Sequence, residues 1–120
     1  MAISGRYTAV LDACVLFSRL QRDVLLSLAH ADLYTARWTQ EIENEWTSSL
    51  IARYPDSASK IPNVVDQMRE AIPDCLIVDY ELFIPSLQLP DENDRHVLAA
   101  AIRGKPKKYP FPSILVVGIL

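Results

Sequence analysis

The chain has 120 residues, of which 50% are hydrophobic and 22% are charged, and its formal net charge is -3 at pH 7. This length suits one domain over residues 1–120, and the composition predicts a globular fold. The small negative charge argues against a surface that coats nucleic acid by charge alone, but it is compatible with a nuclease that has a local acidic cluster. The sequence has no N-terminal signal and no apolar run of about 20 residues, so we expect a cytoplasmic protein.

The first elements predicted along the chain are two strands separated by a helix. The apolar run over residues 7–11 has the length and the Val, Tyr and Thr content of a buried strand. An amphipathic helix is expected over residues 19–31, followed by a short strand over residues 33–36. The apolar stripe of that helix consists of Leu20, Val24, Leu25 and Leu28.

The clearest helix of the chain is predicted over residues 40–53. Thr39 is its expected N-cap, and Ile42, Trp46 and Leu50 follow at intervals of four residues. The elements predicted after it are a helix over residues 61–72, a strand over 75–78, a helix over 92–103 and a strand over 113–117. This alternation predicts an α/β fold in which a parallel sheet is covered by helices on both faces. Cys14 and Cys75 have apolar neighbours and are expected to be buried free thiols.

Asp12 follows the first predicted strand directly and is surrounded by apolar residues. In open α/β sheets, ligands bind beyond the carboxyl ends of the strands, where the strand order reverses. A carboxylate among apolar neighbours is costly to bury without a partner, which favours a functional role. The alternative is a turn in which the side chain of Asp12 accepts hydrogen bonds from nearby backbone amides.

The helix over residues 40–53 carries three glutamates. Glu45 borders the stripe that contains Ile42 and Trp46, whereas Glu41 and Glu43 are interpreted as solvated. Glu41 and Glu45 are four residues apart, so their charges repel each other unless a positive group lies between them. Spacing alone leaves open whether Glu45 belongs to a site or to an ordinary acidic face.

Three acids crowd the start of the helix over residues 92–103: Asp91, Glu92 and Asp94. Asp91 is a reasonable N-cap, because carboxylates interact favourably with the free amides of a first helical turn. Capping does not explain the set, and Asp94 should lie on the same face as the buried stripe of that helix. Clustered carboxylates repel one another, and a hard cation such as Mg²⁺ or Mn²⁺ would hold them together.

Three segments resemble the PIN domain family, which includes VapC-like toxins: "TAVLDACVLF", "ARWTQEIENEW" and "LPDENDRHVLAAAI". The resemblance extends over residues 7–104, and the last segment is the most specific. It implies a Rossmann-like parallel sheet and a metal-dependent ribonuclease that uses Mg²⁺ or Mn²⁺. The catalytic and metal-binding carboxylates that it implies are Asp12, Glu45 and Asp94, with Asp91 as an accessory metal ligand.

The chain departs from the family pattern after Gly104. Family members continue into a strand that is followed by Asn or Asp, then by a further acid, a helix and a strand. Residues 105–120 contain neither Asp nor Glu, so we expect a C-terminally shortened domain with a divergent tail and an empty fourth acidic position. The open sheet edge and the apolar residues 113–119 favour burial of the tail, either as a strand or in a homodimer contact.

The function expected from the resemblance is that of an endoribonuclease, acting as the toxin of a toxin–antitoxin pair. The candidates for contacts with RNA phosphates are Arg19, Arg95 and Lys105. The alternative is a weak or inactive PIN-like module that binds a protein partner such as an antitoxin, which the missing acid favours. A third interpretation is an α/β domain whose acids only cap helices.

Overall fold

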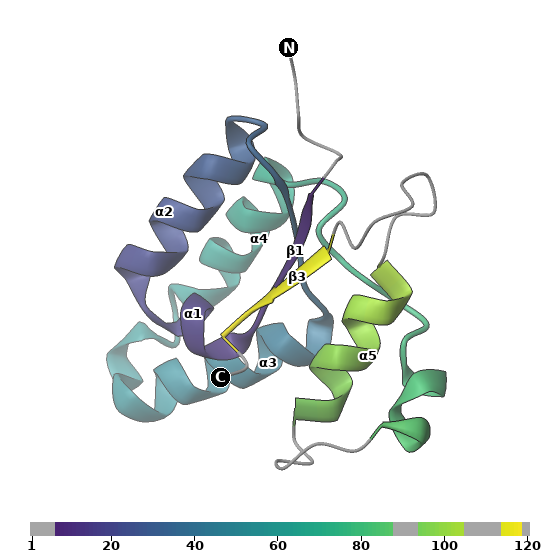
Figure 1. The fold of residues 1–120 in the computed structure, drawn as a ribbon. Helices are drawn as coiled ribbons and strands as arrows, with labels where there is room; N and C mark the ends of the chain where they lie inside the picture. The colour runs from purple at the N-terminus through teal and green to yellow at the C-terminus, as the bar shows by residue number, and fades with distance from the viewer. Residues whose placement is uncertain (1–6, 88–93, 105–113, 119–120) are drawn as a thin grey trace.

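A three-stranded parallel sheet forms the centre of the computed structural model, which describes residues 7–87, 94–104 and 114–118 (Figure 1). The strands are β1 (Thr8–Leu11), β2 (Thr35–Arg37) and β3 (Ile114–Val117), in the order β2-β1-β3. Val10 and Leu11 are fully buried, as expected for a central strand of a parallel sheet. The predicted α/β class with a parallel sheet is therefore confirmed.

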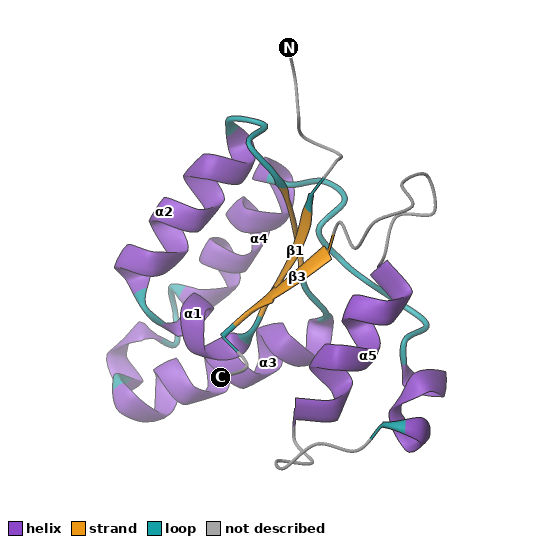
Figure 2. Cartoon of the chain, in the orientation of Figure 1, coloured by secondary structure: helices purple, strands orange, loops and turns teal. Residues whose placement is uncertain are grey.

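Helices cover both faces of this sheet (Figure 2). In Figure 1, α2 (Arg19–His30) and α4 (Ile61–Ala71) lie on one side and α5 (Arg95–Gly104) on the other. The remaining described helices are α1 (Ala13–Phe17), α3 (Gln40–Arg53) and the short 3-10 helices η1 (Pro55–Ser57) and η2 (Glu81–Ser86). No helix among the described residues is long and apolar enough to cross a membrane.

α3 begins where the sequence predicts. The hydroxyl of Thr39 accepts a hydrogen bond from the amide of Ile42 at 3.0 Å, which caps the helix, and Ile42 and Trp46 are buried. α3 lies across the end of the sheet at which β1 leads into α1 (Figure 1). This placement brings its acidic residues to the carboxyl end of the strands.

α2 occupies the predicted residues, but of its predicted apolar stripe only Leu25 packs against the core. Leu20, Val24 and Leu28 are 75%, 49% and 40% exposed, whereas Arg22 is buried. The guanidinium of Arg22 donates to the carbonyl of Leu16 at 2.7 Å and lies 4.9 Å from the ring centroid of Trp46. A cation thus takes the core-facing position, because a backbone carbonyl and an aromatic face compensate for its desolvation.

The strand predicted over residues 75–78 does not form as a regular element. Its one parallel bridge joins Leu76 to Trp38, with hydrogen bonds from the amide of Trp38 to Cys75 O (2.7 Å) and from the amide of Ile77 to Trp38 O (2.8 Å). The pairing ends there because Val78 is exposed and Asp79 takes a left-handed conformation (φ 60°).

The apolar tail was predicted to be buried either as a strand or in a homodimer contact, and residues 114–117 form the strand β3. β3 pairs with β1 in parallel, with Leu11 opposite Val117, and the side chains of Val116 and Val117 are half-buried. The homodimer expected from the sequence remains a prediction. The prediction for the cysteines is right for Cys75, which is buried and free, and wrong for Cys14, which is free but exposed.

Candidate metal centre

Asp12 is fixed at the carboxyl end of β1 by its own backbone and side chain. Its amide donates to Val117 O at 2.9 Å, and its Oδ1 accepts a hydrogen bond from the amide of Ala13 at 2.7 Å, which caps α1. Asp12 is 8% exposed. The predicted turn-forming role is therefore real, and it also holds the carboxylate rigidly at the point where the strand order reverses between β1 and β3.

The carboxylate of Asp12 lies in the electrostatic field of Asp94. Burial raises the pKa of Asp12, the hydrogen bond from Ala13 lowers it, the negative charge of Asp94 raises it further, and His96 lowers it. Asp94 is half-buried and directly precedes α5. The first and last of the three predicted carboxylates therefore act on each other across 82 residues of sequence.

Glu45 completes the predicted set from the first half of α3. Burial raises the pKa of Glu45, the neighbouring His96 lowers it, and the charges of Asp12 and Glu41 raise it. The charge of Asp12 is thus felt by Glu45, and that of Asp94 by Asp12. Among the described residues, however, the acidic ligand atoms that lie within 4.8 Å of one another belong to Glu41 and Glu45 together with His96, and not to the set of three predicted carboxylates. Asp91, the predicted accessory ligand, lies outside the described residues.

His96 lies among these acids and was not singled out by the sequence analysis. It is 6% exposed, its Nε2 lies 3.2 Å from Glu45 Oε2, and its Nδ1 lies 3.6 Å from Glu41 Oε1. Possible ligand atoms of Glu41, Glu45 and His96 all lie within 4.8 Å of one another, so this group could hold a metal ion. Two features of the sequence indicate this group. A histidine stands two positions after Asp94, and the charges of Glu41 and Glu45 repel each other unless a positive group lies between them.

Glu41 is exposed, as predicted, but its carboxylate is held by contacts within the protein. Its side chain is 46% exposed, but its Oε1 accepts a hydrogen bond from the hydroxyl of Tyr80 at 2.8 Å and faces His96. Tyr80 is buried just before η2. A tertiary contact thus orients the Glu41 carboxylate toward the interior.

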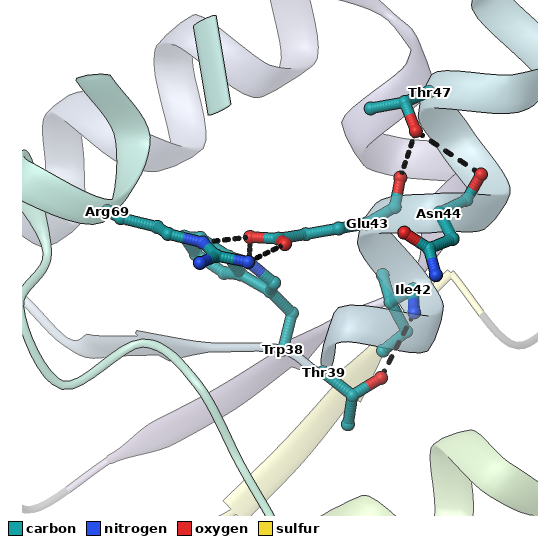
Figure 3. Close-up of polar contacts among 7 residues, drawn as sticks. All are labelled: Trp38, Thr39, Ile42, Glu43, Asn44, Thr47 and Arg69. Carbon is teal, nitrogen blue, oxygen red and sulfur yellow. Dashed lines mark hydrogen bonds and ion pairs between the residues drawn. The ribbon is translucent and has the colours of Figure 1, made fainter. Parts of the chain in front are cut away.

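Glu43 was also predicted to be solvated, and that prediction is wrong. Glu43 is 4% exposed and accepts hydrogen bonds from Trp38 Nε1 at 2.9 Å and Arg69 Nε at 3.0 Å (Figure 3). A second contact joins its carboxylate to Arg69 Nη2. Glu43 points away from the acidic centre and links α3 to α4.

Gly118 directly follows β3, and its backbone lies beside Asp12. Its φ is +108°, and an added Cβ would lie 2.6 Å from Cys14 Sγ and 3.2 Å from Asp12 Cβ. Cys14 Sγ donates a hydrogen bond to Gly118 O at 3.0 Å. Gly118 therefore presents no side chain beside Asp12, and none is easily accommodated there.

Comparison with known proteins identifies no relative of this chain. No family model matches the chain, and neither a curated protein nor a solved structure matches it. The assignment of a function therefore rests on the residues and their geometry.

Proposed function

We propose that the protein is a divalent-metal-dependent endoribonuclease of the PIN type, with Mg²⁺ or Mn²⁺ held by Asp12, Glu45 and Asp94. Asp91 is proposed as an accessory ligand. The observation that carries the proposal is the buried carboxylate of Asp12, which lies at the carboxyl end of the central strand in the fields of Asp94 and Glu45. Carboxylates that are gathered at one place repel one another, and a hard cation compensates this repulsion.

The roles of the protein groups follow from how each is held. The N-cap hydrogen bond fixes Asp12, and the contact with His96 Nε2 restrains Glu45. When bound, the cation would activate a water molecule and stabilise the charge that develops on the phosphodiester. The three carboxylates must be ionised to bind it. A toxin role and an antitoxin partner remain part of the proposal.

A second candidate function is a PIN-like module that binds a protein partner and cleaves RNA slowly or not at all. The position of Gly118 favours it, because the residue that follows β3 beside Asp12 contributes no carboxylate. A site with one carboxylate fewer should bind a cation more weakly. It also offers too few ligands for catalysis by two metal ions.

Cleavage of single-stranded RNA distinguishes the two candidates. For the enzyme we expect slow cleavage in Mg²⁺ or Mn²⁺, complete loss in EDTA, and loss in Asp94→Asn. Glu70→Gln, an exposed change of the same kind on α4, serves as the control and should cleave like the unmodified chain. Cleavage that persists in EDTA, or Asp94→Asn that cleaves at the original rate, would exclude the proposed mechanism. A chain with no cleavage in any metal would favour the binding module.

A further inference from the structure

We propose that His96 and Glu41 bind a second cation, a divalent transition metal such as Zn²⁺, beside the carboxylates Asp12 and Asp94, with Glu45 as the group that orients the imidazole. The site differs from the proposed Mg²⁺ or Mn²⁺ site in having a nitrogen ligand. Glu45 lies between the two sites. The inference rests on the geometry of these residues and does not require that the protein cleave RNA.

The first support is the separation between His96 and Glu41. His96 Nδ1 and Glu41 Oε1 are 3.6 Å apart, which is too long for a hydrogen bond. Zn²⁺ binds imidazole nitrogen and carboxylate oxygen at about 2.0–2.2 Å, so two such ligands lie about 3.3–3.6 Å apart across a four-coordinate ion. The observed gap is therefore the one that a cation would bridge with little movement.

The second support is the unsatisfied ring nitrogen. His96 is 6% exposed, and Nδ1 is one of two buried side-chain polar atoms without a hydrogen-bond partner among the described residues. A buried polar atom without a partner is destabilising in either protonation state of the ring. A positive ring between the two glutamates is the competing explanation, but it would leave the Nδ1 proton without an acceptor at hydrogen-bonding distance.

The contacts around the ligands match those that orient metal-binding groups. Nε2 lies 3.2 Å from Glu45 Oε2, so the ring can donate its proton to this carboxylate and present Nδ1 to a metal. The buried hydroxyl of Tyr80 donates to Glu41 Oε1 at 2.8 Å and holds the other ligand. An imidazole ligand favours Zn²⁺ over Mg²⁺, which prefers oxygen.

Titration calorimetry with Zn²⁺ in millimolar Mg²⁺ tests the site in the full chain. A Cys14→Ser background removes the exposed thiol. We expect one Zn²⁺ per chain, and Glu41→Gln should weaken its binding at least about tenfold. Tyr80→Phe removes the hydroxyl that supports Glu41 and should weaken Zn²⁺ binding by a smaller factor. Glu41 is largely at the surface, so its replacement should not prevent folding.

Two controls separate this site from others. His30→Gln removes the only other histidine, which is exposed on α2, and should leave Zn²⁺ binding unchanged. Asp94→Asn should retain Zn²⁺ binding even though it is expected to lose RNA cleavage, so failure of one proposal does not imply failure of the other. Zn²⁺ binding that is absent from the unmodified chain, unchanged in Glu41→Gln, or lost in His30→Gln would overturn the inference.

Discussion

Asp12 has two roles that use the same carboxylate. One oxygen accepts the capping hydrogen bond from Ala13, while the whole group carries a charge that burial and Asp94 both disfavour. The cap stabilises the turn after β1, and the unfavourable charge is compensated only when a cation binds. This conflict leads to two predictions at the scale of single residues.

Asp94→Asn should stabilise the metal-free protein. The substitution removes a negative charge that acts on Asp12. The free energy of unfolding should therefore increase by about 0.2–1 kcal/mol, as for other partly exposed charge pairs. Urea denaturation in EDTA measures it. Asp56→Asn, at an exposed position in η1, should change the free energy of unfolding little. A loss of stability in Asp94→Asn would show that Asp94 is a structural residue.

The contribution of Asp12 to the stability of the metal-free protein should fall as pH rises through the acid range. The pKa of Asp12 is raised in the folded state, so the folded protein holds this proton more tightly than the unfolded chain. The stabilisation is fully present below the ordinary pKa of an aspartate and is lost as pH rises through the raised value. Comparing denaturation curves of the original chain and Asp12→Asn across this range tests the sign. A flatter profile is expected for Asp12→Asn.

At the scale of elements, a buried ion pair joins α3 to α4. Glu43 accepts hydrogen bonds from Trp38 and Arg69, and it is buried whereas the side chain of Arg69 is 38% exposed (Figure 3). The Arg69 charge can therefore be rehydrated if its partner is removed, whereas the Trp38 N–H cannot. The same helix thus turns Glu43 toward α4 and presents Glu41 and Glu45 to α5.

Glu43→Gln should lower the free energy of unfolding by about 1–3 kcal/mol, because it removes one partner of a charged buried hydrogen-bond network. The amide oxygen of the glutamine can still accept a hydrogen bond from Trp38 Nε1, so the loss of stability should be smaller than in Glu43→Ala. Chemical denaturation of both variants measures the difference. An effect of Glu43→Gln no larger than that of the exposed control Glu70→Gln would contradict the structural role.

The whole molecule brings its acids to one end of the sheet. Asp12 directly follows β1, and Gly118 directly follows the neighbouring strand β3. α3 carries Glu45 and Asp94 directly precedes α5, so these acids come from distant parts of the sequence. The parallel arrangement makes this convergence possible, because the carboxyl ends of parallel strands lie at the same edge.

Mn²⁺ should therefore raise the melting temperature of the protein, since a ligand that binds only the folded state stabilises it by mass action. Asp12→Asn should remove most of the increase. Thermal melts with and without millimolar Mn²⁺ measure it, and Glu70→Gln should respond like the original chain. If the metal leaves the melting temperature of the original chain unchanged, the acids serve mainly to cap helices.

Local pattern by itself determined most of the secondary structure of this protein. The apolar run before Asp12, the Thr39 cap and the periodic apolar residues of α3 and α4 each depend on neighbours in the sequence, so their elements were predictable. Local pattern also indicated Asp12, Glu45 and Asp94 as the acids of interest, through the family resemblance. It failed for residues 75–78, where one bridge and a left-handed Asp79 replace a strand.

Only the tertiary structure decided which polar side chains enter the interior. The stripe of α2 predicts burial of Leu20, Val24 and Leu28, yet Arg22 is buried because Leu16 O and Trp46 lie opposite it. Glu43 is buried because Arg69 reaches it, and His96 faces Glu41 and Glu45 because α5 packs beside α3. The burial of a charge depends on a partner that is distant in sequence, and no local pattern contains that partner.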